Sequence, residues 1–332
     1  MLNDLANKNI LFVAPSFFGY GQEIKQELEK QGAQVDLLLD RPFKSSFMKG
    51  MTTINRQMVM GIAKQYYQKK LMEYARSHYD LVFVINGQTL SPQILSQWRQ
   101  AFPRAQFVLY VWDSIKNRQT IQKNFEFFDC CFSFDKNDAD FFGLNFHPLF
   151  FSRGFQNTRP QNTSSYDVSF VGTAHTNRYA VVSTISQLFS KNIRFYKYLY
   201  LQAKWVYFYY KATNPTFRSS TMNEFVFNPL DKEMVQKIFF QSTSILDIEH
   251  PLQTGLTIRS LEALGAKKKL ITTNKNIIDY DFYNSENILV LDRNAPKIRE
   301  EFFYEPYKEV DDLIYKKYSI VGWLDQILQV TA

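Results

Sequence analysis

The chain has 332 residues, of which 45% are hydrophobic and 21% charged, and its formal net charge is +7. These values are ordinary for a globular protein, and the length exceeds what one hydrophobic core usually serves, so we expect two domains. No apolar run is long enough for a transmembrane helix. The apolar residues 10–14 are too few for the core of a signal peptide, so we expect a cytoplasmic protein.

Aromatic residues are unusually frequent, making up 17% of the chain with 31 Phe and 20 Tyr. Rings in this number predict deep cores, or a surface that meets sugars or lipid headgroups. The basic excess suits phosphate-bearing ligands or an anionic membrane surface, and we expect no nucleic-acid partner.

The two cysteines, Cys130 and Cys131, are adjacent in an apolar run. Neighbouring strand residues point to opposite faces, so we expect no disulfide between them and interpret both as buried apolar residues. One adjacent pair without further spacing predicts no metal site.

The first half of the chain alternates apolar strands with helices. Residues 9–14 (NILFVA) form a continuous apolar strand, 15–21 (PSFFGYG) a loop, and 22–31 an amphipathic helix that Gly32 ends. This order indicates a parallel sheet covered by helices. The further elements that we expect here are strands 34–39, 81–85, 106–111 and 130–134, helix 92–100, and a basic, polar region that is helical through 73–77.

A polar stretch at 152–165 (SRGFQNTRPQNTSS) is the clearest break in composition, and we place an interdomain linker at 152–166. The alternation then restarts, with strands 167–171, 193–198, 244–248, 269–272 and 288–291 and helices 178–189, 232–240 and 256–264. We therefore expect an α/β protein with two Rossmann-like domains, 1–151 and 167–304, and a ligand cleft between them. The tail 305–332, helical at 313–328, would pack back on the first domain.

The segment 247–274 (DIEHPLQTGLTIRSLEALGAKKKLITTN) is the richest in candidate binding residues. A helix is expected from Leu256, and its first-turn N–H groups and dipole would form an anion site. At 100° per residue, Gly255, Arg259 and Glu262 fall within about 60° of one another. Phosphates would take the N–H groups and Arg259, and ribose hydroxyls would take Glu262. The alternative is an ordinary Arg–Glu pair on a solvated helix face.

The segment 254–273 (TGLTIRSLEALGAKKKLITT) resembles the donor-binding element of GT-B glycosyltransferases, which in retaining members often reads E-G-x-G-x-x-x-x-E-A-x-A-x-G-x-P-V-I. Glu262 and Ala263 match the second Glu and its Ala, which in that family bind the nucleotide ribose, and Gly255 matches the first glycine. Thr254 stands where the family has its first Glu, so a retaining outcome does not follow.

The resemblance is to small bacterial glycosyltransferases of lipopolysaccharide, capsule or exopolysaccharide synthesis, related to the CgeB-like group. It extends over most of the chain, through the segments FFGY, INGQTLSP, LYVWDSIKN, FSFD, DVSFVGTAHTNRY and DIEHPLQTGLTIRSLEALGAKKKLITTN. It implies the GT-B fold, a nucleotide-sugar donor, an oligosaccharide or lipid-linked acceptor, and no metal or other cofactor.

The segment 170–179 (FVGTAHTNRY) is the second candidate for donor contacts. Gly172 would let the backbone bend after a strand, so that Thr173, His175 and Arg178 face the cleft. The matching loop of GT-B enzymes contributes phosphate or sugar contacts, and Arg178 is our candidate phosphate ligand. His175 is a candidate general base, or a solvated loop histidine.

For the same loop, the alternative is a plain strand-to-helix turn capped by Thr176 or Asn177.

Asp113, in 110–117 (YVWDSIKN), has two interpretations as well. Its carboxylate would deprotonate an acceptor hydroxyl, as inverting transferases require, or it would cap the next helix.

Further candidates lie on the loop before the helix at 256–264. Glu249 and His250 would touch the donor sugar or fill the domain interface. Gln253 belongs with them as a cleft-lining residue, and Leu256 contributes a backbone N–H group to the anion site.

The loop at 15–21 holds Gly19 and Gly21, and a G-x-G without a third glycine is a weak signal. In GT-B proteins this loop borders the acceptor and the donor phosphate, so Gly19, Tyr20 and Gly21 are candidate lining residues. A tight turn between strand and helix is the alternative.

Asp138 and Asp140 spell D-x-D, the metal–nucleotide signature of the other major glycosyltransferase fold. Here they follow a strand and begin a helix, where acidic residues favour the dipole. No other hard ligands converge on them, so we predict no metal site.

The stretch 196–211 (YKYLYLQAKWVYFYYK) combines many aromatics with Lys197, Lys204 and Lys211. This composition suits a segment that rests on anionic lipid, assisted by the basic region 44–70. The alternative is a core strand followed by a buried helix.

These observations together predict a metal-independent GT-B glycosyltransferase that moves a sugar from a nucleotide sugar to a bacterial surface polysaccharide or glycolipid, at the inner face of the cytoplasmic membrane. Closing of the cleft and stabilisation of the leaving diphosphate would carry catalysis. The alternatives are a polyol-phosphate transferase or sugar-nucleotide epimerase of the same fold, or a non-catalytic nucleotide-binding protein.

Overall fold

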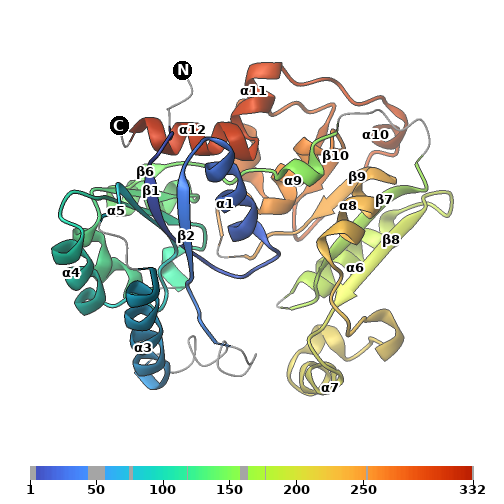
Figure 1. The fold of residues 1–332 in the computed structure, drawn as a ribbon. Helices are drawn as coiled ribbons and strands as arrows, with labels where there is room; N and C mark the ends of the chain where they lie inside the picture. The colour runs from blue at the N-terminus through green and yellow to red at the C-terminus, as the bar shows by residue number, and fades with distance from the viewer. Residues whose placement is uncertain are drawn as a thin grey trace. The chain divides into compact units, whose positions relative to one another are not determined.

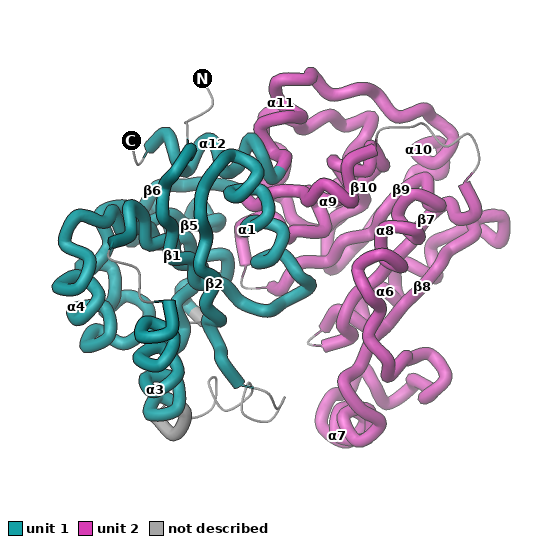
Figure 2. Tube along the Cα trace, in the orientation of Figure 1, with its two compact units in different colours: residues 1–148, 320–332 teal, residues 149–319 magenta. Residues whose placement is uncertain are grey.

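The computed structural model describes residues 5–43, 57–74, 78–117, 119–157, 164–175, 177–251 and 253–330. Parts of four expectations lie outside these residues: the basic region at 44–56, the helical end at 75–77, the middle of the linker at 158–163, and Thr176 as a cap. The chain forms two compact units, the first of residues 1–148 and 320–332 and the second of 149–319 (Figure 2).

The first unit contains a parallel sheet in the order β2-β1-β3-β4-β5-β6 (Figure 1). The order in which successive strands are added reverses at β1, because β1 pairs with β2 on one side and with β3 on the other. The strands are β1 Asn9–Ala14, β2 Gln34–Leu39, β3 Leu81–Ile85, β4 Gln106–Val111, β5 Cys130–Ser133 and β6 Asn145–Phe146. The helices are α1 Tyr20–Lys30, α3 Gln57–Tyr74, α4 Pro92–Ala101, α5 Lys136–Phe142 and α12 Ile320–Val330, with 3₁₀ turns Ile115–Asn117 and Gln119–Phe127.

Burial on both faces explains why these short runs form strands. All five residues of β3 are buried, and its Phe83 stacks on Phe12 of β1 with ring centroids 5.2 Å apart. Parallel strands covered by helices need such continuous apolar runs. The helix starts are equally local: Ser91 accepts the Ile94 N–H at the start of α4, and Asp135 caps α5.

The C-terminal helix α12 completes the core of the first unit. Trp323 is 1% exposed, lies 4.9 Å from the ring of Tyr110 on β4, and stacks on His147. The expected single helix 313–328 is therefore wrong: the tail forms two helices, α11 Asp312–Lys317 in the second unit and α12 in the first. Ser319 and Tyr318 between them pair with the backbone of Phe151.

The second unit contains another parallel sheet, in the order β11-β10-β9-β7-β8. Its strands are β7 Tyr166–Thr173, β8 Phe195–Tyr200, β9 Ser242–Asp247, β10 Lys269–Thr272 and β11 Ile288–Val290. Its helices are α6 Arg178–Leu188, α7 Lys204–Thr213, α8 Lys232–Phe240, α9 Ile258–Gly265, α10 Glu301–Tyr304 and α11. The strand order reverses at β7, which pairs with β8 on one side and β9 on the other. Open α/β sheets bind ligands at such a switch point, next to the carboxyl ends of the strands.

Both cysteines are free thiols and only partly buried, not fully buried as expected. Burial nevertheless raises the pKa of Cys131 to about 12, so this thiol is a poor nucleophile at neutral pH. In the part of the chain that the structure describes, no group of three or more His, Cys, Asp or Glu is placed to hold a metal ion. Within the same residues, no helix is both long and apolar enough to cross a bilayer.

Candidate functional site

The candidate residues fall into two sets, one in each unit, and each set lies at the carboxyl edge of its sheet. In the second unit they occupy the loop after β7 and the loop after β9. These two neighbouring strands lie where the strand order of the sheet reverses. Ligand-binding side chains of doubly wound sheets come from such strand ends. The chain order β7–α6 and β9–α9 therefore brings 172–178 and 247–262 to one edge.

Arg178 joins these two loops. It is the first residue of α6, and its Nε donates to the carbonyl oxygen of Ile248 at 2.8 Å while Nη1 donates to that of Thr173 at 3.3 Å. Burial lowers the pKa of Arg178, Asp247 raises it, and Arg293 lowers it. A guanidinium stays charged even so, so a partly buried positive charge lies where β7 and β9 end.

Arg293, which follows β11, is a functional candidate that the sequence analysis missed. Its Nη1 donates to Oε1 of Glu249 at 2.5 Å, and Nη2 donates to the Glu249 carbonyl oxygen at 2.9 Å and to Oδ1 of Asn177 at 3.0 Å. The other carboxylate oxygen of Glu249 accepts from Thr273 at 2.5 Å. This network fixes Glu249, 7% exposed, beside a second guanidinium; burial is the main cause that raises the pKa of Glu249.

The two loop histidines lie together, with ring centroids 6.3 Å apart. Burial, with the charge of Arg178, lowers the pKa of His175 to about 4. Burial and the charges of Arg178 and Arg293 also lower the pKa of His250. Both rings are therefore neutral at pH 7 and can donate one hydrogen bond and accept another, but His175 is a weak base.

The helix that follows β9 starts later than expected. α9 begins at Ile258, and the Thr257 hydroxyl caps it by accepting from the N–H groups of Arg259 and Ser260. The expected start at Leu256 is wrong, and Gly255 does not share a helix face with Arg259, because it precedes the cap.

Asp247, at the end of β9, ties this helix start to the sheet. Its Oδ2 accepts from the hydroxyls of Thr257 at 2.5 Å and Ser260 at 2.7 Å. This position carried no predicted role. Its carboxylate follows the last apolar residue of a strand, the signal that would have pointed to it.

The turn before α9 is held by side-chain amides. The carbonyl oxygens of Thr254 and Gly255 accept from Asn274 Nδ2 at 3.1 and 3.2 Å, and Gln253 Nε2 donates to Gly255 at 2.9 Å. Leu256, 1% exposed, anchors the turn in the core. These hydrogen bonds fix the carbonyl oxygens of Thr254 and Gly255, and with them the orientation of the peptide groups that follow.

Glu262 does not lie on a solvated face. It is fully buried, and Arg259 Nη1 lies 2.5 Å from its Oε2. The interpretation as a solvated surface pair is therefore wrong, because a buried carboxylate needs such a partner to stay charged. Arg259 itself is 19% exposed and lies 5.7 Å from the Phe239 ring.

The strand β7 is longer than expected and includes Gly172 and Thr173, which pair with Leu199 and Tyr200 of β8. The expected sharp bend at Gly172 is wrong. A Cβ atom there would meet the Phe170 ring at 2.9 Å, so the glycine leaves room for that ring.

In the first unit, Gly19, Tyr20 and Gly21 form the turn from β1 into α1. Gly19 has φ +72°, a left-handed conformation that favours glycine. A Cβ atom on Gly21 would meet Ala14 Cβ at 2.9 Å. Tyr20 is buried, and its ring lies 6.5 Å from Trp112 at the end of β4. The structural needs of the turn account for both glycines.

Asp113 follows Trp112 and is bound by amides from the end of β3. Its Oδ2 accepts from Asn86 Nδ2 at 3.1 Å and lies 3.5 Å from Gln88 Nε2. The N–H of Ile115 in the next 3₁₀ turn goes to Asp138 instead, at 2.7 Å. The D-x-D aspartate thus performs the capping considered for Asp113, whose own carboxylate is only half-buried.

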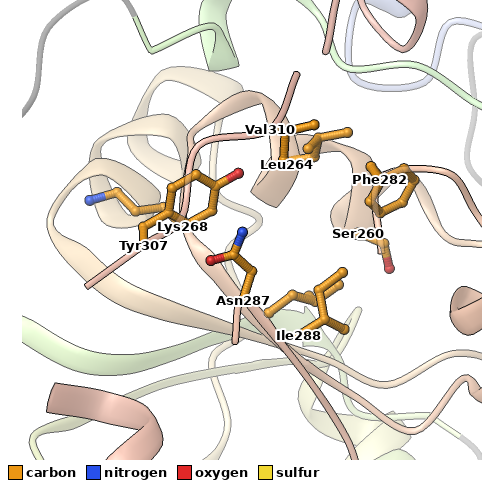
Figure 3. A pocket seen from close by; sticks show the side chains of 9 residues that line it. Ser260, Leu264, Lys268, Phe282, Asn287, Ile288, Tyr307 and Val310 are labelled. Atoms are coloured by element: carbon orange, nitrogen blue, oxygen red, sulfur yellow. The ribbon is translucent and has the colours of Figure 1, made fainter. Parts of the chain in front are cut away.

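A small cavity in the second unit lies on the far side of α9 (Figure 3). Polar side chains in its wall come from Ser260, Lys268, Asn287 and Tyr307. The Asn287 amide bonds the backbone of Lys308 in both directions. Lys268 Nζ donates to the Phe240 carbonyl oxygen, and burial lowers its pKa to about 8. The cavity is a small packing gap beside α9, and none of Arg178, Arg259 and Arg293 lines it.

No family profile matches the chain, and no curated protein is similar to it in sequence. Its fold is similar to solved structures over nearly its whole length. Alr3699/HepE of Anabaena in complex with UDP and glucose matches with a TM-score of 0.59 at 12% identity, over 98% of this chain and 99% of that chain. The same protein in complex with UDP-glucose gives 0.57 at 12% identity, over 97% and 98%. MurG of Acinetobacter baumannii gives 0.51 at 10% identity, over 97% and 99%.

These neighbours have the GT-B fold. The chain accordingly has the GT-B fold, with two parallel sheets and their helices as two Rossmann-like domains. The expected fold class is confirmed.

Proposed function

We propose that the protein is a glycosyltransferase that binds a nucleotide sugar at the carboxyl edge of the second unit's sheet. The observation that carries this proposal is the gathering of Arg178, Arg293 and Arg259 around the ends of β7 and β9, where their charges influence one another. A diphosphate carries the negative charge that such a cluster would neutralise. The HepE structures with UDP and UDP-glucose support the choice of ligand.

The polar candidate residues of the second unit have these roles in the proposal. Arg178 and Arg293 bind the diphosphate, with the turn 254–256 and Thr173 beside them. Glu262 accepts from the ribose hydroxyls, in the position that the GT-B resemblance gives it; because its carboxylate is fully buried against Arg259, this contact requires the Arg259 side chain to move aside on binding. Glu249, His250 and Gln253 line the donor sugar. The neutral His175 donates a hydrogen bond to the donor.

For the transfer step, the acceptor hydroxyl oxygen bonds to the anomeric carbon while the bond from that carbon to the diphosphate oxygen breaks. The diphosphate keeps the electron pair, and the arginines stabilise its charge. The hydroxyl proton goes to a carboxylate base, for which Asp113 is our candidate. We assign His175 to the donor instead, because its ring lies beside that of His250 and close to the charge of Arg178.

The acceptor that we propose is a bacterial surface polysaccharide or glycolipid, as in the CgeB-like and lipopolysaccharide or capsule enzymes that the sequence resembles. The reaction needs no metal, since the arginines supply the positive charge. The site of action is the inner face of the cytoplasmic membrane.

A thermal-shift screen of nucleotides and sugar nucleotides tests the donor, since a ligand that binds the folded state raises the melting temperature. Release of nucleoside diphosphate from the best donor in EDTA then tests for an active, metal-independent enzyme. Release that depends on an added oligosaccharide or lipid-linked acceptor supports a transferase. Conversion of the donor sugar without release indicates an epimerase, and binding without either reaction indicates a binding protein. Chelation that stops turnover, restored by magnesium or manganese, contradicts metal independence.

A further inference from the structure

The helix α7 exposes three large aromatic side chains. Trp205 is 69% exposed, Phe208 58% and Tyr209 57%. Their spacing of i, i+3 and i+4 puts them on one helix face, which Ala212, also exposed, continues at i+7. We call Trp205, Phe208, Tyr209 and Ala212 the aromatic face of α7. Soluble proteins rarely expose contiguous apolar surface of this kind without a function.

Folding does not require this face, because the opposite face of α7 attaches the helix to the second unit. Val206 and Tyr207 are buried, and the Tyr207 ring lies 5.5 Å from Phe225. Tyr207 also donates to the carbonyl oxygen of Ser220, which Lys211 Nζ contacts at 2.8 Å. The helix therefore has a firm base and an aromatic surface turned outward.

The stretch of sequence that contains α7 carries only basic charges. Residues 168–223 contain no Asp or Glu and seven Lys or Arg, namely Arg178, Lys191, Arg194, Lys197, Lys204, Lys211 and Arg218. Without these seven, 32 of the chain's 39 basic residues remain, which equals its 32 acidic residues. The net charge of +7 thus belongs to this segment alone. Lys204 and Lys211 lie on α7 itself, and Arg218 follows the 3₁₀ turn Pro215–Phe217 that packs against it.

The topology relates α7 to the candidate site. The helix follows the carboxyl end of β8 after three residues, and β8 pairs in parallel with β7, whose carboxyl end carries Thr173. The aromatic face and the candidate donor site therefore belong to the same edge of this sheet. Figure 1 shows α7 at one extremity of the second unit, beyond the end of β8.

We propose that the aromatic face of α7, with Lys204 and Arg218 beside it, docks the protein on an anionic lipid bilayer. Trp and Tyr favour the boundary between headgroups and acyl chains, and basic side chains next to them bind anionic headgroups. A second copy of the chain is a poorer occupant, because two such faces would bring like charges together. The proposed lipid contact is argued from α7 and its basic neighbours and does not depend on the proposed function. Only the idea that this contact presents a lipid-linked acceptor to the enzyme rests on the proposed function.

The test is co-sedimentation of the full chain with vesicles of phosphatidylcholine alone or with about one-third phosphatidylglycerol. Binding to the anionic vesicles, weakened by salt, is expected. Trp205→Ala/Phe208→Ala should weaken binding at least about tenfold, whereas Phe141→Ala, an exposed aromatic of α5, should leave it unchanged. Lys204→Glu/Arg218→Glu should also weaken it, and Lys136→Glu on α5 should not.

Tryptophan emission adds a direct readout of insertion. Trp98 and Trp323 are buried, so in a Trp112→Phe background a blue shift with anionic vesicles reports Trp205. Equal binding to both vesicle types, binding to neither, or unchanged binding of the α7 variants overturns the proposal. A dimer in solution that Trp205→Ala/Phe208→Ala dissolves assigns the face to self-association and overturns it as well. Nucleotide binding by the α7 variants is measured separately. A loss of vesicle binding with unchanged nucleotide binding concerns the lipid contact alone and leaves the proposed function untouched.

Discussion

Arg293 binds Glu249 across 44 residues of sequence, through Nη1 to the carboxylate at 2.5 Å and through Nη2 to the main-chain carbonyl oxygen at 2.9 Å. The Arg293 side chain thus fixes the position of Glu249 in the loop after β9 and also pairs with its negative charge. Asn177 before α6 shares the same guanidinium. The loops after β7, β9 and β11 are therefore coupled through Arg293.

Arg293→Ala should lower the free energy of unfolding by about 3 kcal/mol, because it leaves a buried carboxylate without its partner. Urea denaturation followed by circular dichroism measures this. Arg299→Ala, at an exposed arginine of the same unit, is the control and should cost less than about 1 kcal/mol. Equal losses for the two variants would show that the Arg293 network carries no special stability.

The pKa of His175 predicts a pH dependence. Its folded-state pKa, about 4, lies below the ordinary 6.5, so the unfolded state takes up the proton first as the pH falls. The stability contribution is complete above pH 6.5 and is lost as the pH falls toward 4. A pKa shift from 6.5 to about 4 corresponds to a loss of about 3 kcal/mol once the pH lies below 4.

His175→Gln should therefore flatten the curve of unfolding free energy against pH in this window, relative to the wild type. His78→Gln, at an exposed histidine of the first unit, should leave the curve unchanged. A wild-type curve that runs parallel to that of His175→Gln refutes the assigned shift.

Glu262→Gln should weaken binding of the nucleotide by roughly 1.5–3 kcal/mol, the value of a charge-assisted hydrogen bond. Calorimetry measures the affinity, and a thermal melt of the free protein separates this loss from a loss of folding, since Glu262 also pairs with Arg259. Glu233→Gln on the exposed side of α8 is the matched control. An unchanged affinity removes Glu262 from the nucleotide site.

The sequence predicted the sheets well, because their strands are continuous apolar runs with helices between them. It was less accurate at strand and helix ends. β7 continues through Gly172 because the missing side chain makes room for Phe170, a contact that no local pattern reveals. The start of α9 was readable in principle, since Thr257 is a preferred cap residue.

The candidate site was predicted in part. Arg178 and Glu249 could be named as candidates because each follows an apolar strand, β7 and β9 respectively, and their roles stay predictions. Arg293 was missed because its bonds to Glu249 and Asn177 span 44 and 116 residues, so that only the fold brings them together. The tail was divided wrongly for the same reason: α12 is held by Tyr110 and His147, contacts that the tail sequence does not encode.

Calorimetric titration with UDP, GDP, CDP and ADP tests the central claim most directly, which is that Arg178 binds the diphosphate of a nucleotide. We predict that a nucleoside diphosphate binds the wild type, that Arg178→Met and Arg178→Lys weaken this binding about tenfold or more, and that Arg194→Met leaves it within about twofold. Arg194 is the matched control, an exposed arginine paired with Asp167 before β8. The nucleoside without phosphates should bind all four proteins equally. If no diphosphate binds the folded wild type, or if the Arg178 variants bind it as tightly as Arg194→Met does, the account is contradicted.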